Sequence, residues 1–237
     1  VKKILQYLFE DNLKVLINDE KYKIDYIKIL KRREYTMIIG ITGGIGSGKS
    51  TVSRILKDKG FCFIDLDIIS HDVIQDSKIK AELFKNFGSE IFDKEEISRK
   101  KLGKVVFEDK NKLERLNSIM HPEILKRMRK KIEKIKEKIV FVEIQLLFEV
   151  GWEREFDLIL LVWSDKNTQI KRVLARDNRS ENETKNIINS QISLDEKIKK
   201  SDYVIENNND NLEDLKNKID NFINFLETKL NFEKKEV

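Results

Sequence analysis

The stretch MIIGITGGIGSGKS, from Met37 to Ser50, decides the fold of this 237-residue chain. Its last eight residues match the pattern G-x-x-x-x-G-K-[ST] of a phosphate-binding loop, and five of the nine glycines of the chain lie between residues 40 and 48. The apolar run Met37–Thr42 before the loop predicts a buried strand, and Ser50–Leu56 after it follows helical spacing. A strand, a glycine-rich loop and a helix in this order indicate that the chain binds a nucleoside triphosphate.

The residue types of the loop suit this task. Glycines allow successive backbone N–H groups to face one anion, and the start of the following helix adds the positive end of its dipole. Lys49 can reach the β- and γ-phosphates, and the Ser50 hydroxyl can coordinate Mg²⁺. The alternative is a glycine-rich structural turn with a solvated lysine.

Composition favours a cytoplasmic protein. The lone cysteine, Cys62, indicates a reducing compartment, and no apolar run is long enough to span a bilayer. Residues 1–36 carry nine Lys or Arg and six Asp or Glu, whereas residues 37–237 carry 38 and 36. Because a nucleic-acid-binding body usually has a stronger basic bias, we expect no nucleic-acid partner and no membrane partner.

Residues 1–36 differ from the rest of the chain. Apolar residues between Ile4 and Ile17 fall near helical spacing, but polar residues interrupt the apolar core that a secretory signal needs. Because the strand before the phosphate loop begins at Met37, we expect Met37 to be the native start, with residues 1–36 an appendage or an artefact of the assigned start. The alternative is an amphipathic extension that docks on residues 37–237 or on a partner.

Strand and helix patterns alternate beyond the phosphate loop. In addition to Met37–Thr42, buried strands are predicted at Phe61–Ile64, Ile139–Ile144, Leu158–Trp163 and Tyr203–Ile205. Helical patterns cover Ile68–Gln75, Lys78–Phe87, Lys101–Phe107, Lys110–Lys136, Thr168–Arg176, Thr184–Ile192 and Asn211–Leu230. This alternation predicts an α/β fold whose five strands form a parallel sheet with helices on both faces and ligands at the carboxyl ends of the strands. The charged stretch Lys126–Lys138 is predicted to be the solvated face of a helix.

A GTPase is disfavoured among the classes of phosphate-loop protein. No D-x-x-G string occurs in the chain, and the N-K-x-D string Asn217–Asp220 lies inside a helical pattern instead of after a buried strand. Motor ATPases and small-molecule kinases stay open at this point.

Two carboxylates follow the predicted strand Phe61–Ile64. Asp65 and Asp67 would lie at the same edge of the sheet as the phosphate loop, and on one side if the strand continues that far. A carboxylate there could accept the proton of a substrate hydroxyl that attacks the γ-phosphate. The alternative is that Asp67 caps the following helix, and it could do both.

Residues 41–51, ITGGIGSGKST, followed by residues 64–69, IDLDII, closely resemble the dephospho-CoA kinase family. Further matching blocks are Phe87-Gly88, Arg99 with Leu102, Leu116-Asn117, His121-Pro122, Leu146 to Glu149, Lys171-Arg172, Arg176-Asp177 and Asp202 to Asn207. The resemblance thus covers nearly all of residues 37 to about 225. It implies a three-layer P-loop kinase fold with a central five-stranded parallel sheet, a helical acceptor-binding region and a lid. It also implies ATP-dependent phosphorylation of the ribose 3′-hydroxyl of dephospho-CoA to give coenzyme A, the last step of coenzyme A biosynthesis.

The same resemblance implies roles for individual residues. Asp67 is the expected base on the acceptor hydroxyl, and Lys49 and Arg176 are expected to act on the transferred phosphate, with Mg²⁺ on Ser50. A guanidinium suits Arg176 because it stays charged and can bridge phosphate oxygens, although the alternative is a surface ion pair. The expected ATP-binding residues are Gly44, Ile45, Gly46, Ser47, Gly48, Lys49, Ser50, Thr51, Arg172 and Asn207.

Several positions depart from the family pattern. His71 stands where relatives usually have Arg or Lys, and Gln145 and Ser193 stand where they usually have proline. Residues 208–209, both asparagine, replace an expected glycine in a turn that asparagine tolerates. No zinc site is expected, because neither histidine has other metal-ligand residues near it in sequence. Contacts with substrate or Mg²⁺ and roles in packing both stay open for His121, Glu143 and Glu149.

The expected partners are ATP and dephospho-CoA, and the expected assembly is a monomer or weak homo-oligomer. We expect the helical segment Leu83–Met128 to bind the acceptor and the segment Arg172–Asn189 to close as a lid that excludes water. The alternatives are another P-loop small-molecule or nucleotide kinase, and a non-catalytic ATP-binding module whose N-terminal extension recruits a partner.

Overall fold

The computed structural model describes residues 36–107, 109–177 and 179–235. The chain divides into two compact units, residues 1–36 and residues 37–237. The helical pattern predicted between Ile4 and Ile17 lies outside the described residues, and the native start at Met37 stays a prediction.

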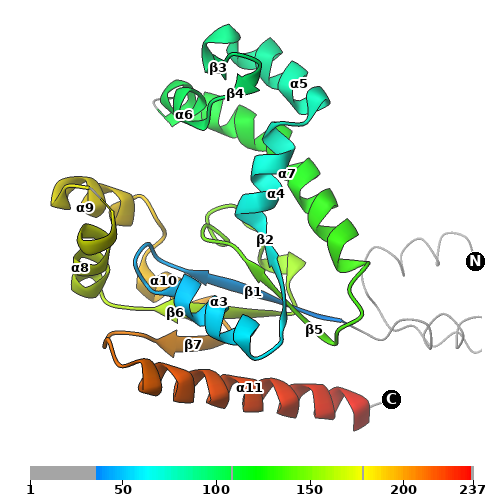
Figure 1. Cartoon of the computed structure of the whole chain (residues 1–237), viewed down its shortest axis with the longest axis vertical. Helices are drawn as coiled ribbons and strands as arrows, with labels where there is room; N and C mark the ends of the chain where they lie inside the picture. The colour runs from blue at the N-terminus through cyan, green and yellow to red at the C-terminus, as the bar shows by residue number, and fades with distance from the viewer. Residues whose placement is uncertain (1–35, 108, 178, 236–237) are drawn as a thin grey trace, which may run out of the picture. The chain divides into compact units, whose positions relative to one another are not determined.

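A five-stranded parallel sheet lies at the centre of the second unit (Figure 1). In spatial order its strands are β2 (Cys62–Asp65), β5 (Ile139–Glu143), β1 (Met37–Gly43), β6 (Leu158–Trp163) and β7 (Tyr203–Glu206). All four pairings are parallel. The predicted α/β class and the five predicted strands are therefore confirmed, with bounds that differ by a residue or so.

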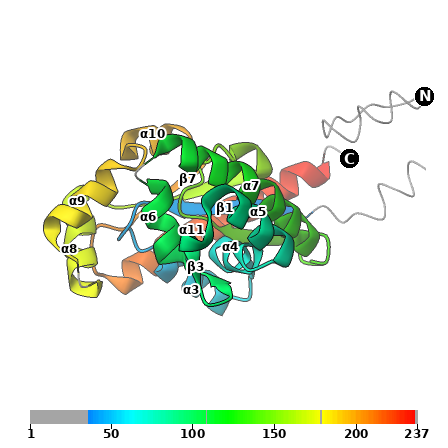
Figure 2. The same cartoon turned by 90° about the horizontal axis from the view of Figure 1, so that it is seen from above.

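Helices cover both faces of this sheet and give three layers (Figures 1 and 2). Alternation along β5 divides the core, because Phe141 packs on one face while its neighbours Val140 and Val142 pack on the other. On the Phe141 face lie α3 (Lys49–Asp58) and α11 (Leu212–Lys235), and on the opposite face lie α4 (Leu66–Ile74) and α7 (Lys110–Ile132). Both cores consist of closely packed, fully buried apolar side chains, and they hold the carboxyl ends of the strands in fixed register.

A helical region projects from one side of the sheet beyond α4 and α7 (Figure 1). It contains α5 (Ser77–Phe87), η1 (Ser89–Ile91), α6 (Arg99–Phe107) and an antiparallel hairpin of β3 (Phe92–Asp93) and β4 (Glu96–Ile97). The sequence patterns missed the hairpin because its turn contains no glycine, proline or asparagine. Lys94 adopts the left-handed conformation there, with φ of 56°.

Three more helices lie between β6 and β7, namely α8 (Lys166–Arg176), α9 (Glu181–Asn189) and α10 (Leu194–Lys199), and η2 (Glu153–Glu155) precedes β6. The prediction of a helix at Thr184–Ile192 was displaced, because Ser180 and Glu183 form a capping box that begins α9 at Glu181. The prediction that a helix extends to Lys136 was too long, since α7 ends at Ile132 and a turn follows. Ile135 keeps apolar spacing in that turn because it packs on the same core as Ile132.

The charged stretch Lys126–Lys138 is thus solvated helix only as far as Ile132. Within the described ranges, none of the helices combines the length and the apolar character that crossing a membrane requires.

Candidate active site

The phosphate loop connects β1 to α3 and needs its glycines for two reasons. Gly46 and Gly48 have φ of 73° and 90°, in the left-handed region that other residues adopt at a cost. A Cβ on Gly48 would also overlap Nδ2 of Asn207, and a Cβ on Gly46 would lie 2.7 Å from the carbonyl oxygen of Gln169. Among the described residues no side chain caps the N-terminus of α3, so its first N–H groups are available to an anion.

Lys49 forms an ion pair with Glu143 at the mouth of this loop. Its Nζ donates to Oε1 of Glu143 at 3.0 Å, and the two side chains are only 12% and 15% exposed. Glu143 ends β5, where the strand register aligns it with Ile41 of β1 and with Asp65 of β2. Glu143, whose role the sequence left open, therefore lies at the triphosphate end of the sheet, held by the lysine that a phosphate would attract.

The two carboxylates after β2 have different environments. Oδ1 of Asp65 accepts hydrogen bonds from the backbone N–H of Asp67 at 2.8 Å and of Ile68 at 3.4 Å, so Asp65 is the N-cap of α4. Asp67 lies in the first turn of the helix with an exposed side chain, which makes no hydrogen bond or ion pair with any described residue. The suggestion that Asp67 caps the helix is wrong, and this leaves its carboxylate available to a substrate.

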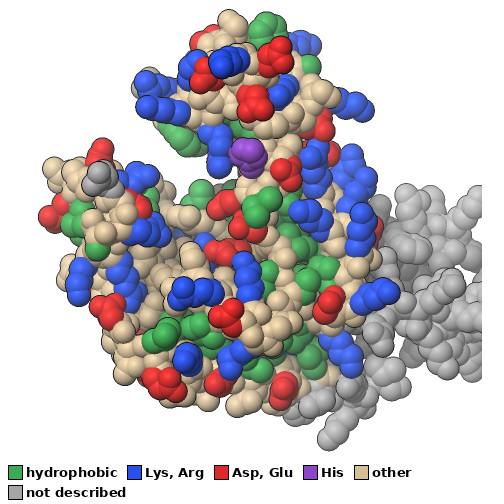
Figure 3. Space-filling view, viewed as in Figure 1, with side chains coloured by type: hydrophobic (Ala, Val, Ile, Leu, Met, Phe, Trp, Pro, Cys, Tyr) green, Lys and Arg blue, Asp and Glu red, His purple; other side chains and the backbone are tan. Residues whose placement is uncertain are grey.

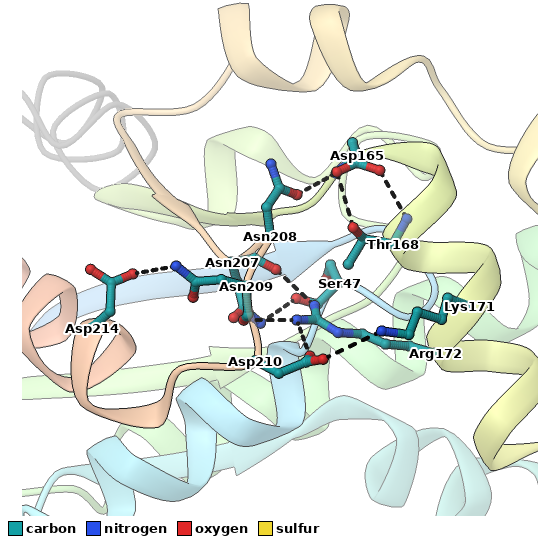
Figure 4. Close-up of polar contacts among 10 residues, drawn as sticks. All are labelled: Ser47, Asp165, Thr168, Lys171, Arg172, Asn207, Asn208, Asn209, Asp210 and Asp214. Carbon is teal, nitrogen blue, oxygen red and sulfur yellow. Dashed lines mark hydrogen bonds and ion pairs between the residues drawn. The ribbon is translucent and has the colours of Figure 1, made fainter.

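Asn207 joins the phosphate loop to the loop that follows β7 (Figure 4). Its side chain is 6% exposed, and Nδ2 donates to the carbonyl oxygen of Ser47 at 2.8 Å. Arg172 donates to the carbonyl oxygens of Asn207 at 2.7 Å and Asn209 at 3.1 Å, and pairs with Asp210 at 3.1 Å. The hydrogen bond from Arg172 holds the pKa of the Asp210 carboxyl below its ordinary value. Both predicted ATP-binding residues outside the phosphate loop, Arg172 and Asn207, thus lie together beside it.

These residues enclose a pocket of about 220 Å³. Its wall contains Gly48, Thr51, Arg172, Asn207, Leu212 and Leu215. The remaining lining residues, Asn209, Asp210 and Asn211, are polar, so the pocket combines two leucines with polar and charged side chains.

Arg176 lies outside this group of contacts. One face of α8 packs on the phosphate loop, through Gln169 and Val173. Arg176 lies on the same face, because it follows Val173 by three residues. Its guanidinium instead donates two hydrogen bonds to the carboxylate of Asp177, at 2.8 Å to Oδ1 and 3.0 Å to Oδ2. The Arg176 side chain is 61% exposed. This hydrogen bonding raises the pKa of Arg176 and lowers the pKa of Asp177. The surface ion pair that the sequence left as an alternative is present in this structure.

The two histidines have different surroundings. His71 is exposed on α4, one turn after Asp67. His121 lies on α7 with its ring 4.9 Å from that of Trp152 in an edge-on arrangement, and burial lowers its pKa. Pro122 lies inside α7 without ending the helix. Across residues 36–107, 109–177 and 179–235, no group of three or more His, Cys, Asp and Glu side chains could hold a metal ion.

The departures from the family pattern have local structural substitutes. The Thr42 hydroxyl donates to the carbonyl oxygen of Gln145 at 3.1 Å, which fixes the chain after β5 through its backbone. Ser193 caps α10 through a hydrogen bond from Glu196 N to its hydroxyl at 3.3 Å. Oδ1 of Asn208 accepts from Asp165 N at 2.7 Å and joins the loop after β7 to the start of α8 (Figure 4).

Sequence patterns also missed a buried ionic contact between the turn after β5 and α10. Lys197 of α10 is fully buried and pairs with Glu149 at 2.8 Å. A lysine in a charged stretch, Leu194–Lys200, gives no local signal of burial, because its partner lies almost fifty residues earlier.

Comparisons with known proteins show which family this chain resembles. A family model described as dephospho-CoA kinase matches residues 37–213. A dephospho-CoA kinase of Fusobacterium nucleatum is 46% identical over 187 residues, which are 78% of this chain and 96% of the relative. The crystal structure of TT1252 from Thermus thermophilus aligns with a TM-score of 0.74 and 33% identity, over 81% of this chain and 98% of the other. A dephospho-CoA kinase from Campylobacter jejuni aligns with a TM-score of 0.62 and 30% identity, over 80% and 96% of the two chains. This chain belongs to the dephospho-CoA kinase family.

Proposed function

We propose that this chain transfers the γ-phosphoryl group of ATP to the ribose 3′-hydroxyl of dephospho-CoA, giving ADP and coenzyme A. The observation that carries the proposal is an exposed, unpaired carboxylate, Asp67, at the same sheet edge as the phosphate loop and its lysine. A phosphate grip alone would suit many proteins, but a free carboxylate beside it suits transfer to a hydroxyl.

ATP binds with its phosphates in the loop Gly44–Thr51. Lys49 leaves Glu143 and contacts the β- and γ-phosphates, while the backbone N–H groups at the start of α3 contact phosphate oxygens. The pocket beside Gly48 takes the adenine. Arg172 is held by three oxygen acceptors along its edge, and its flat face is therefore suited to lie against the base.

The residues at the loop fit Mg²⁺. The Ser50 side chain is exposed in the first turn of α3, and the carboxylate of Glu143 lies at the same edge of the sheet. Mg²⁺ prefers oxygen ligands, retains several waters and is commonly held through one or two protein groups together with phosphates. Ser50 would hold it directly and Glu143 through water, and the ion would neutralise charge on the β- and γ-phosphates.

The chemical step is an in-line displacement. The oxygen of the 3′-hydroxyl bonds to the γ-phosphorus while Asp67 accepts the hydroxyl proton. The bond between the γ-phosphorus and the β–γ bridging oxygen breaks, and ADP is released. The guanidinium of Arg176 leaves Asp177 and binds the transferred phosphoryl group. Its two parallel N–H donors stabilise the negative charge of that group. Because the transition state is loose, positioning contributes more than deprotonation.

The acceptor and the lid lie on either side of the reacting groups. Figure 3 shows a hollow between the projecting helical region and the α8–α9 part of the surface, with charged side chains along it. The segment Leu83–Met128 binds the acceptor there, and the segment Arg172–Asn189 closes over the phosphates to exclude water. The enzyme acts in the cytoplasm, as a monomer or weak homo-oligomer.

The test uses the full chain with ATP, MgCl₂ and dephospho-CoA, and identifies the product by mass while ADP is counted. Coenzyme A formed in step with ADP is the expected result. Competition with nucleoside monophosphates and other hydroxyl acceptors separates this activity from that of another small-molecule kinase. Absence of coenzyme A with both the full chain and residues 37–237 would overturn the proposal.

A further inference from the structure

The buried ion pair between Lys197 and Glu149 connects the end of the α8–α9 segment to the sheet. Lys197 Nζ lies 2.8 Å from Oε1 of Glu149, and the lysine is fully buried while the carboxylate is 17% exposed. The same Oε1 accepts a hydrogen bond from the backbone N–H of Ile192 at 3.1 Å. Ile192 lies three residues after the end of α9, so one carboxylate binds both the exit from α9 and the helix that follows.

The Glu149 side of this contact is fixed to the sheet. The two preceding residues, Leu147 and Phe148, are buried in the core. The turn that contains them begins at Gln145, whose carbonyl oxygen accepts from Thr42 at the end of β1. Glu149 is therefore held in the frame that positions the phosphate loop.

This pair is a poor way to gain stability. Taking two charges out of water costs several kcal/mol per ion, and that cost is offset only where the remaining donors and acceptors are satisfied. Here Lys197 Nζ and Oε2 of Glu149 are buried without a hydrogen-bond partner among the described residues. A buried charge pair of this kind gives direction and register instead, because neither charge can move without leaving the other unpaired.

We propose that Glu149 and Lys197 are positioning residues that anchor the C-terminal end of the lid, so that α9 closes on bound ATP in one register and keeps water from the γ-phosphate. The inference rests on the proposed kinase function. When the anchor is lost, α9 closes imperfectly. Water then replaces the acceptor hydroxyl as nucleophile, its oxygen bonds to the γ-phosphorus, the bond to the bridging oxygen breaks, and the products are ADP, phosphate and a proton.

The first test is the double variant Glu149→Gln/Lys197→Met, which removes both charges and keeps an acceptor for Ile192. Its melting temperature should stay within about 3 °C of wild type, since a buried pair contributes little net stability. The kcat for coenzyme A should fall about fivefold, and the ADP formed per coenzyme A should rise about threefold, because lid closure excludes water. The matched control is Lys199→Met on the same helix, whose exposed side chain makes no ion pair with a described residue. This control should change neither the rate of coenzyme A formation nor the ADP formed per coenzyme A.

A folded double variant that forms ADP and coenzyme A in step, at wild-type or at reduced rate, would show a structural role and overturn the inference. If the double variant does not fold, hydrogen exchange in the wild-type chain decides. The amides of Ile192 and α10 should exchange at least about tenfold more slowly than those of α9. Equal exchange in the two segments would contradict an anchor. If the wild-type chain makes no coenzyme A, the proposed function is wrong. The hydrogen-exchange result would still test the anchor, because it does not depend on activity.

Discussion

The carboxyl edge of the sheet and the α8–α9 segment are held together in different ways. At the sheet edge, Lys49 pairs with Glu143, 94 residues away, and Asn207 donates to Ser47, 160 residues away. Arg172, earlier in α8, belongs to the sheet edge through its bonds to Asn207 and Asp210. From Arg176 through α9, the pairs join close neighbours in sequence: Arg176–Asp177, Ser180–Glu183 and Glu181–Lys185. The first region is built by the whole fold, and the second is largely built by itself.

This difference indicates how the work of the enzyme is divided. Contacts across the sheet fix the phosphate loop and the pocket beside Gly48, and the proposed electrostatic catalysis requires such preorganisation. A segment held by local contacts can open and close at little cost to the rest, and lids are drawn from such segments. In the proposed mechanism, Arg176 belongs to the moving part and pairs with Asp177 until the lid closes.

Replacement of Lys49 should have the largest effect. Lys49→Met removes the cation that contacts the β- and γ-phosphates and leaves Glu143 mostly buried without a partner, so kcat/KM should fall about 10³-fold. Coenzyme A measured by mass gives the rate. Lys59→Met, which removes an exposed ion pair at the end of α3, is the matched control. A loss of less than about tenfold would show that the sheet edge does not hold the reacting phosphate.

Replacement of Asp67 should have the next largest effect. Asp67→Asn should lower kcat about 10²-fold, because it removes the proton acceptor while positioning continues to contribute. Calorimetric titration should find an unchanged Kd for ATP, since Asp67 makes no contact with the phosphate loop. Asp72→Asn, also exposed on α4, should retain full activity. Full activity in Asp67→Asn would favour a non-catalytic or differently arranged site.

The long-range contact of Asn207 can be tested by its effect on ATP binding. Asn207→Ala leaves the Ser47 carbonyl without its donor and frees the phosphate loop, so the Kd for ATP should rise about tenfold. The control is Asn217→Ala on α11, whose exposed side chain does not line the pocket. Equal affinities in the two variants would mean that the cross-sheet contact does not preorganise the ATP site.

The smallest effect is expected in the lid itself. Ser180→Ala removes the capping box of α9, so the amides of this helix should exchange about fivefold faster. Exchange in β1 and β5 should not change, because the contacts of α9 are largely its own. Ser190→Ala at the other end of the helix is the control. Faster exchange at the sheet edge in Ser180→Ala would mean that the two regions are one unit.

Much of the fold could be predicted because its signals are local. Leu158–Trp163 is a continuous apolar run that is buried on both faces, and the structure gives β6 those same bounds. The start of α9 was missed because the capping box of Ser180 and Glu183 contains no apolar residue. The six-residue helix α10 was missed because it is too short to show a period.

The candidate site was predictable only in part for the same reason. Lys49, Ser50 and Asp67 lie in continuous motifs that identify them. Two contacts join segments far apart in sequence: Asn207 with Ser47, and Lys197 with Glu149. Hydrophobic periodicity is a local pattern and cannot predict such pairs. The fork of Arg176 on Asp177 joins adjacent residues, but the sequence alone left it undecided between an ion pair and a phosphate contact.

Hydrogen exchange in the presence and absence of ligands tests the division of roles most directly. The wild-type chain would be compared alone and with Mg²⁺, a non-hydrolysable ATP analogue and dephospho-CoA. The account predicts slow exchange in β1 and β5 under both conditions, with α9 exchanging rapidly when free and at least about tenfold more slowly when both ligands are bound. Exchange in α9 that does not respond to the two ligands would contradict a closing lid, and with it the account of how Arg176 reaches the phosphate.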